Sequence, residues 1–203
     1  GDCLSSIAVS GNVLAVLMTK KYDLVIVGAG PGGAMAARIA GENGLRTALI
    51  ERKTDPAKIS RGCAMMFAIE SGYYFAERMY YNKTSKKMIF PVNGFTVDYD
   101  GPTRNFYAPD GKTRLAFGDY EENSKKGDQG RLSLVYDKEK LIEGLLHKAV
   151  STGVDLFTGV NVDGIEKKGQ SLRVTGGGES FESPFVIGAD GINSRVASLM
   201  GFN

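Results

Sequence analysis

The chain has 203 residues, of which 42% are apolar and 24% are charged, and its formal net charge at pH 7 is +2. The apolar content is typical of a soluble globular protein, and so small a charge without a basic block argues against nucleic acid as a partner. Two cysteines, Cys3 and Cys63, and one histidine, His147, are too scattered for a metal site, and no apolar run reaches the roughly eighteen residues of a membrane-spanning helix.

Residues 1–17 are mildly apolar and begin with no basic region, which argues against a secretory signal. Met18 stands shortly before the first predicted strand, at a natural start for the fold. We therefore expect residues 1–17 to be a non-native or disordered leader. The chain is predicted to be cytoplasmic, with peripheral contact to a membrane left open.

The first predicted elements form a βαβ unit: strand 22–28, helix 31–43 and strand 46–51. Glycines with the spacing G-x-G-x-x-G lie between the first strand and the helix. Gly28 allows a tight bend out of the strand, and Gly30 lets the backbone approach a pyrophosphate. Gly33 lets the helix pack closely on the strand.

The helix start and the acid after the second strand complete the prediction of a dinucleotide site. The helix N-terminus, with Pro31 and Gly32 in its first turn, offers free N–H groups and partial positive charge to phosphates. Glu51 ends the second strand, where it can accept hydrogen bonds from ribose hydroxyls. The motif by itself does not distinguish FAD from NAD.

The middle of the chain predicts less regular structure. Residues 52–85 are rich in aromatic residues and methionines without a clean period, and are interpreted either as a loop and short helix over a ligand or as an apolar flank of the sheet. Residues 86–118 alternate β-formers with turn signals and predict an inserted antiparallel sheet. The polar residues 121–130 predict a mobile loop.

The second half of the chain returns to α/β patterning. Asp137 can cap a helix that extends to about residue 152, on which His147 is expected to face solvent. The later elements are predicted as a third parallel strand at 154–157, a β-meander at 160–167, 171–175 and 180–182, a buried strand at 184–188 and a short helix near 192–200.

The last buried strand leads into a second motif, Gly188-Ala189-Asp190-Gly191, followed by Ser194. With the glycine motif, this segment resembles the G-A-D-G-x-x-S segment of FAD-dependent hydroxylases and geranylgeranyl-reductase-type flavoproteins. The resemblance covers Met18 to Asn203. It implies an α/β fold: a Rossmann-like FAD-binding domain of the glutathione-reductase type, with a β-meander and an inserted antiparallel sheet.

The resemblance also implies a domain division and a truncation. The FAD-binding domain would comprise residues 18–85 and 131–203, and residues 86–130 would be part of a substrate-domain sheet. Family members carry a further G-D-A-x-H-x-x-P-type turn downstream, which this sequence lacks. We therefore expect an N-terminal fragment, inactive by itself.

Several more residues are assigned to the FAD site by the resemblance. Asp190 and Gly191 are implied to lie close to the first glycine turn, where they help to hold FAD and the NAD(P)H route. Arginines after the acid reach the FAD phosphates in similar flavoproteins, which points to Arg61 and also to Arg52. Ser194 and the adjacent Arg195 are interpreted either as ligand contacts or only as a helix start.

Cys63 and Ala197 bear on the choice within the family. Cys63 stands where the reductases have a cysteine-glycine segment near the flavin ring, although the following glycines are missing. It either lines the ring, as the one catalytic candidate, or is an ordinary buried cysteine, which is the preferred interpretation. Related hydroxylases often carry an arginine at the position of Ala197, so its absence favours a reductase.

These observations predict an FAD-dependent oxidoreductase of the geranylgeranyl-reductase or related dehydrogenase type, which transfers hydride to or from an organic, isoprenoid or lipid substrate. NADH or NADPH is the expected electron donor. One alternative is an NAD(P)H-dependent FAD monooxygenase of the aromatic-hydroxylase type. Another is a non-catalytic nucleotide-binding fragment, and a plain NAD-dependent dehydrogenase is the most distant.

Overall fold

The computed structural model describes residues 18–60, 62, 63, 65–68, 73, 74, 77, 78, 80–82, 87–89, 97–101, 104–117, 119–126 and 133–202. Its centre is a parallel sheet with the strand order β13-β3-β2-β17. The strands are β2 (Leu24–Val27), β3 (Thr47–Glu51), β13 (Asp155–Thr158) and β17 (Phe185–Gly188). The predicted parallel strands and their βαβ start are confirmed.

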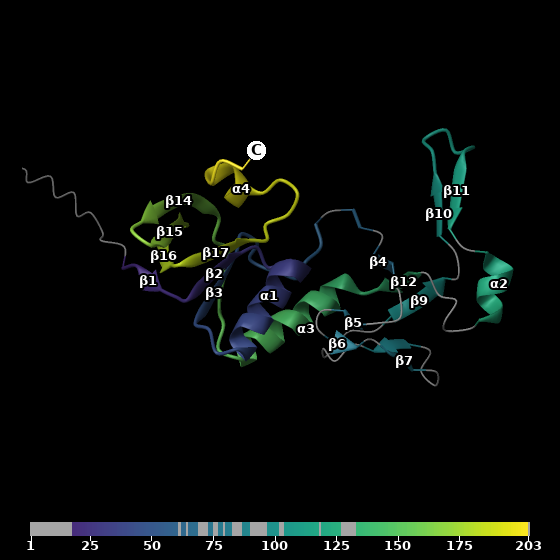
Figure 1. The fold of residues 1–203 in the computed structure, drawn as a ribbon, viewed down its shortest axis with the longest axis horizontal. Coiled ribbons are helices and arrows are strands. Elements are labelled where there is room, and N and C mark those ends of the chain that lie inside the picture. The colour runs from purple at the N-terminus through teal and green to yellow at the C-terminus, as the bar shows by residue number, and fades with distance from the viewer. Residues whose placement is uncertain are drawn as a thin grey trace, which may run out of the picture.

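Both faces of this sheet are buried, which gives the domain three layers (Figure 1). Helices α1 (Pro31–Glu42) and α3 (Lys138–Ser151) pack together on one face. The other face meets the β-meander of β14 (Val162–Lys168), β15 (Ser171–Gly176) and β16 (Glu179–Ser183). The helices and meander predicted from the sequence are confirmed.

The alternation of side chains along β2 explains these two cores. Leu24 and Ile26 belong to the apolar cluster under the helices, whereas Val25 and Val27 belong to the cluster under the meander with Phe181. Successive side chains of a strand point to opposite faces, so a continuous apolar run buries both. The run Leu24–Val27 therefore specifies a central strand.

Polar caps set where the helices start. The Asp137 carboxylate accepts a hydrogen bond from the Lys140 N–H at 3.0 Å, as predicted, and Ser194 Oγ accepts one from the Ala197 N–H at 2.9 Å at the start of α4 (Arg195–Leu199). Each oxygen satisfies one of the N–H groups that a helix start leaves without a partner. His147 is exposed on α3, as expected.

The inserted region contains the predicted antiparallel strands, but they pair beyond its predicted bounds. Strand β9 (Val97–Gly101) pairs with β12 (Ser133–Tyr136), which pairs with β4 (Met66–Ala68). The division of the chain into domains stays a prediction. Four further described pieces are β5 (Tyr73–Tyr74) with β6 (Glu77–Arg78), and β7 (Tyr80–Asn82) with β8 (Lys87–Ile89).

Two expectations about the middle of the chain are wrong. Residues 52–85 are not uniformly irregular, because β4 to β7 lie within them. The first half of the segment predicted as a mobile loop at 121–130 belongs instead to helix α2 (Tyr120–Lys125). The Asp119 carboxylate caps this helix by accepting a hydrogen bond from the Glu122 N–H at 2.8 Å. Acidic residues in its first turn and Lys125 in its last match the helix dipole. Residues 127–130 lie outside the described part.

Strand β1 (Lys20–Lys21) was not predicted from the sequence; it runs parallel to β16 and extends the meander sheet. A hairpin of β10 (Arg104–Tyr107) and β11 (Arg114–Phe117) lies within the segment 86–118 that predicted antiparallel strands, and it stands away from the parallel sheet (Figure 1). None of the described helices is long and apolar enough to span a bilayer.

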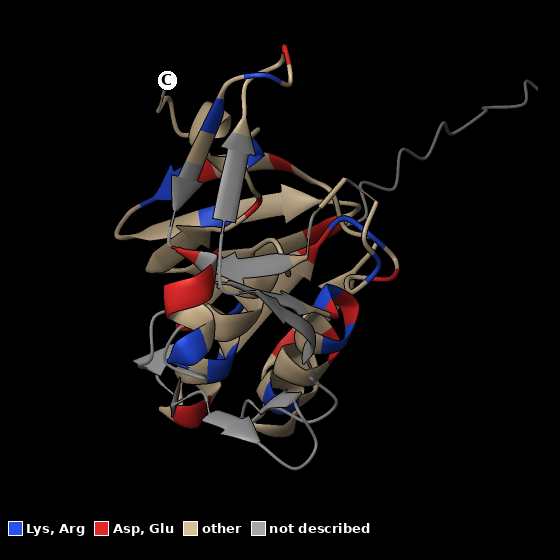
Figure 2. Ribbon diagram, turned by 90° about the vertical axis from the view of Figure 1, so that its right-hand side faces the viewer, with Lys and Arg blue, Asp and Glu red and all other residues tan. Residues whose placement is uncertain are grey.

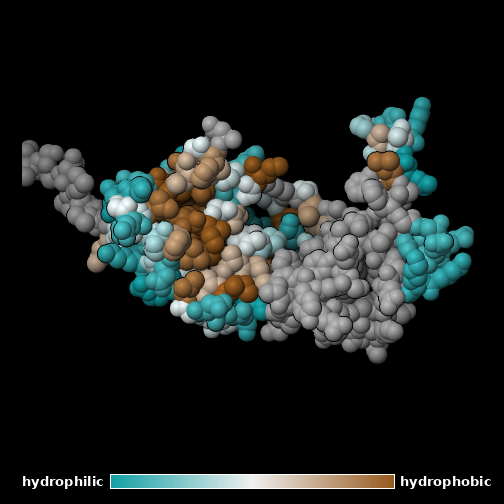
Figure 3. Space-filling model, in the orientation of Figure 1, coloured by the Kyte–Doolittle hydropathy of each residue, from teal (hydrophilic) through white to brown (hydrophobic). Residues whose placement is uncertain are grey.

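Strand β17 is the edge of the parallel sheet among the described strands. Its Phe185 and Ile187 side chains are 69% and 39% exposed. Figure 3 shows apolar side chains gathered over this part of the molecule. The sheet therefore has one apolar edge that the described residues do not cover. The strand predicted at 184–188 is present, but the prediction that it is buried is wrong, because it pairs on one side only among the described strands.

Candidate functional site

A cleft of about 380 Å³ opens where strands β2, β3 and β17 end. Its wall contains most of the residues predicted for the site: Gly28, Gly30, Pro31, Glu51, Arg52, Asp190 and Gly191. The carboxyl ends of neighbouring parallel strands meet at one edge of a sheet, which is where open α/β folds place ligands. The two sequence motifs therefore come together although 160 residues separate Gly28 from Gly188 (188 − 28 = 160).

Gly28 and Gly33 are required by the packing of the protein itself. A Cβ on Gly33 would lie 1.8 Å from the Gly28 carbonyl oxygen, and a Cβ on Gly28 would lie 2.4 Å from the Ala189 carbonyl oxygen. Gly28 also has φ +102°, a conformation that favours glycine. The turn after β2 is thus clamped between the first turn of α1 and the turn after β17.

Gly30 and Gly32 have the opposite environment. No described atom lies within 4 Å of a Cβ built on either residue, and Gly30 lines the cleft. No described side chain caps the N-terminus of α1, which starts with Pro31. The free N–H groups and the positive end of the helix dipole are therefore left for an anionic group.

Glu51 is buried and held by the backbone. Its side chain is 6% exposed, and its two carboxylate oxygens accept hydrogen bonds from the Ala29 N–H at 2.8 Å and from the Lys53 N–H at 2.9 Å. A carboxylate oxygen has two acceptor positions, so the described residues leave one position on each oxygen for a ligand. The fixed carboxylate at the wall of the cleft suits a pair of ribose hydroxyls.

The backbone of Asp190 packs against the glycine turn at Gly28, whereas its carboxylate hydrogen-bonds within the segment 190–196. The carboxylate accepts hydrogen bonds from Ser194 Oγ at 2.6 Å and from the Val196 N–H at 3.0 Å, as well as from the Arg195 N–H. Partial burial opposes ionisation of this group and is the largest single influence on its pKa. The hydrogen bonds together outweigh it and hold the pKa of Asp190 below its ordinary value.

Replacement of Asp190 by asparagine is expected to destabilise the chain by about 1–2 kcal/mol at neutral pH, because a charged acceptor at a helix start is lost. The folded pKa lies below the unfolded one, so the contribution is present above the ordinary carboxyl pKa of 3.8 and is lost as the pH falls. Urea unfolding of both proteins should show a smaller difference at about pH 3 than at pH 7. An equal difference at both would contradict this role.

Ser194 and Arg195 differ in their placement. Ser194 caps α4 and hydrogen-bonds to Asp190, so the structure gives it the role of a helix start. Arg195 lines the cleft together with Asn193. Arg61 lies outside the described residues.

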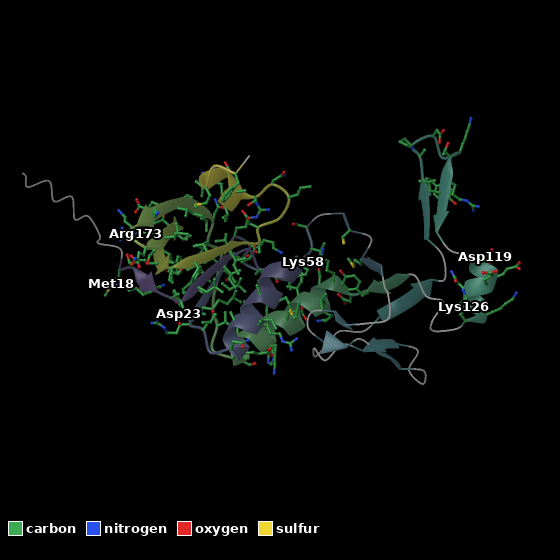
Figure 4. All side chains as sticks on the ribbon, viewed as in Figure 1. Met18, Asp23, Lys58, Asp119, Lys126 and Arg173 are labelled. Carbon is green, nitrogen blue, oxygen red and sulfur yellow. The ribbon has the colours of Figure 1, made fainter. Side chains whose placement is uncertain are left out.

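The wall of the cleft is rich in cations. Arg52, Lys53, Lys58, Lys138 and Arg195 line it, and its two carboxylates already accept backbone N–H groups. Lys58 is 68% exposed at its side chain (labelled in Figure 4), and in Figure 2 further charged residues lie on the outer faces of the helices. Lys58 is paired with Glu139 at 3.6 Å, but the other four cations still outnumber the two carboxylates of the wall, and this balance favours an anionic ligand.

Sequence reasoning missed Lys58 and Lys138. Lys138 follows the helix-capping Asp137 and has the pattern of an ordinary first-turn residue. Only the packing of α3 beside α1 brings it to the cleft. Lys58 belongs to a polar loop with no pattern, and no local signal could have identified either residue.

The preferred interpretation of Cys63 as a buried cysteine is wrong. Its side chain is exposed and lines the cleft. The Lys138 ammonium donates to its sulfur at 3.7 Å, and the Met65 N–H donates to it at 3.4 Å. Cys63 belongs to neither apolar cluster of the described residues, and its sequence neighbours do not reveal this. The catalytic assignment of Cys63 remains a prediction.

The chemistry of this cleft fits a dinucleotide that carries a pyrophosphate. An uncapped helix N-terminus, a glycine whose missing side chain leaves the backbone open, a fixed carboxylate and several cations converge in it. The fold and the site together define an α/β dinucleotide-binding domain.

Residues 21–203 match the family described as FAD binding domain, and the chain belongs to this family. A digeranylgeranylglycerophospholipid reductase from Methanosarcina mazei is 26% identical over 194 residues, which cover 92% of this chain and 42% of the relative. The chain thus spans less than half the length of this relative.

Solved structures show the same fold. A geranylgeranyl bacteriochlorophyll reductase-like protein from Thermoplasma acidophilum superposes with a TM-score of 0.58 at 21% identity, over 85% of this chain and 40% of that protein. An anhydrotetracycline hydroxylase from Streptomyces rimosus superposes with a TM-score of 0.51 at 22% identity, over 89% of this chain and 34% of that protein. The resemblance to both groups predicted from the two motifs is confirmed.

Proposed function

We propose that this chain holds FAD for an oxidoreductase of the geranylgeranyl-reductase type. The observation that carries the proposal is the convergence of the α1 N-terminus, Glu51 and the cationic wall in one cleft. The reductase assignment is supported by the relative named for a phospholipid with geranylgeranyl chains. An isoprenoid or lipid substrate and NADH or NADPH as electron donor complete the proposal.

The proposed roles of the residues follow from their positions. Bound FAD would supply the hydride chemistry. The first turn of α1, approached through Gly30, would hold the pyrophosphate, and Glu51 would hold the adenosine ribose. Arg52 and Lys138 stand on the wall where they would offset phosphate charge.

The two carboxylates of the cleft are assigned positioning roles. Glu51 is committed to the N–H groups of Ala29 and Lys53, and Asp190 to those of the α4 start. The hydrogen bonds to Asp190 hold its pKa below the ordinary value, so this carboxyl is a poor proton donor at neutral pH. Hydride transfer itself requires no acid or base from these residues.

Titration of the chain with FAD, followed by visible absorbance and flavin fluorescence, tests the cofactor. Replacement of Glu51 by glutamine is expected to lower the affinity for FAD by about tenfold or more, because the ribose hydroxyls lose a charged acceptor worth about 1.5–3 kcal/mol. Lys148→Met, on the exposed surface of α3, serves as the control variant. A folded wild-type chain that does not bind FAD would overturn the proposal.

Oxygen consumption distinguishes the reductase from the proposed alternatives. Substrate-dependent oxygen uptake during NADH or NADPH oxidation would favour the monooxygenase, and anaerobic reduction of the substrate would favour the reductase. Tight FAD binding without either activity would favour a nucleotide-binding role alone.

A further inference from the structure

We propose that Lys53 is a positioning residue that shapes the Glu51 side of the cleft, and that it acts through backbone groups without ligand contact. Its ammonium donates to the carbonyl oxygens of Pro56 at 2.5 Å and Lys58 at 2.9 Å. An ammonium has three donors, so two of them are committed to its own loop. The proposal rests on the proposed function, because the segment it shapes would contact FAD.

The backbone of Lys53 joins three walls of the cleft. Its N–H donates to the Glu51 carboxylate at 2.9 Å, and its carbonyl accepts the Gly159 N–H at 3.0 Å. The Val160 N–H in turn donates to the Glu51 carbonyl at 3.0 Å. Glu51, Lys53 and Val160 all line the cleft. A shift of Lys53 would therefore move the acid and the start of the meander together.

The segment held by the ammonium is also anchored at its far end. Ala57 is 6% exposed, and its N–H donates to Asp55 at 3.2 Å. The Ile59 N–H donates to the Glu139 carboxylate on α3 at 2.9 Å. The hydrogen bonds from the Lys53 ammonium to the carbonyls of Pro56 and Lys58 close residues 53–58 into a ring. The ring places Lys58 on the wall of the cleft, and Ser60, just after the ring, lines the cleft as well.

A lysine beside a phosphate site would ordinarily be taken as a direct phosphate ligand. The geometry favours the positioning role, because two of the three donors of this ammonium are used by carbonyl groups of its own loop. A positioning lysine should affect every ligand that uses this wall, with or without a pyrophosphate. A lysine that contacts the phosphate directly should affect the binding of charged ligands only, and it should make their binding more sensitive to salt.

The test compares Lys53→Met and Lys53→Arg with the control Lys148→Met. Amide hydrogen exchange at Ala57 and Ile59, measured without ligand, reports the loop. Titrations with FAD and with adenosine report the site. Loss of the ammonium should speed exchange at both amides by about tenfold or more and weaken the binding of both ligands by a similar factor, which corresponds to at least one of the two charge-assisted hydrogen bonds.

Arginine can donate to the same two carbonyls, so Lys53→Arg should restore slow exchange and most of the affinity. Unchanged exchange with weaker FAD alone would overturn the inference in favour of direct contact. Faster exchange with unchanged affinities would overturn it as well. A wild-type chain that binds neither ligand would instead contradict the proposed function, and the exchange data would still report the state of the loop.

Discussion

Replacement of Gly33 by alanine is expected to destabilise the chain by about 3–5 kcal/mol, which is a large fraction of the stability of a domain. The new Cβ would lie 1.8 Å from the Gly28 carbonyl oxygen, which belongs to the backbone and cannot rotate away. Helix α1 would have to move off the sheet and lose apolar contacts on both sides. Urea unfolding followed by circular dichroism measures this loss.

Gly32→Ala is the matched control for that experiment. Its Cβ meets no described atom within 4 Å, and alanine is a better helix former than glycine. The control should therefore change the stability by less than about 1 kcal/mol. Equal stabilities of the Gly33→Ala and Gly32→Ala proteins would contradict the close packing of α1 on the turn after β2.

Replacement of Gly30 by valine should have the reverse effect, with folding retained and FAD binding lost. Gly30 has φ −66° and ψ −179°, an extended conformation that valine adopts readily, and its Cβ would meet no described atom. The side chain would fill the space before the N–H groups of α1. Loss of two charge-assisted hydrogen bonds, at about 1.5–3 kcal/mol each, predicts at least about a 100-fold weaker complex.

Binding and stability must both be measured on the Gly30→Val protein. FAD affinity comes from quenching of flavin fluorescence, and the free energy of unfolding comes from urea in the absence of FAD. Undiminished affinity would show that the pyrophosphate does not approach Gly30. A loss of stability as large as that of Gly33→Ala would show that Gly30 is packed against the protein itself.

The parts of the fold that could be predicted are those coded by local patterns. The glycine spacing after β2, the apolar run Leu24–Val27 and the capping Asp137 act within a few residues of themselves. Helix α2 has a local cap as well, in Asp119, but the short polar run after it has no apolar face and was taken for a loop. Short helices without such a face give little periodic signal.

The parts that could not be predicted depend on contacts between distant segments. Strand β1 is two residues long and exists through its pairing with β16. Lys138 reaches the cleft because α3 packs on α1, and Cys63 is exposed because its loop lies outside both cores. The sequence indicated the glycine motif. Only the structure shows that Gly33 is packed against the Gly28 carbonyl, whereas Gly30 has no described atom within 4 Å of its Cβ position.

The pairing of β2 with β17 has a consequence for the order of events during synthesis. Leu24 is made early, yet its partner on one side, Phe185, follows 161 residues later (185 − 24 = 161). Closing so long a loop is slow, and a domain of this kind cannot complete its sheet until the late strand has left the ribosome. The nascent chain should therefore acquire nucleotide affinity abruptly, once the segment around Asp190 has emerged.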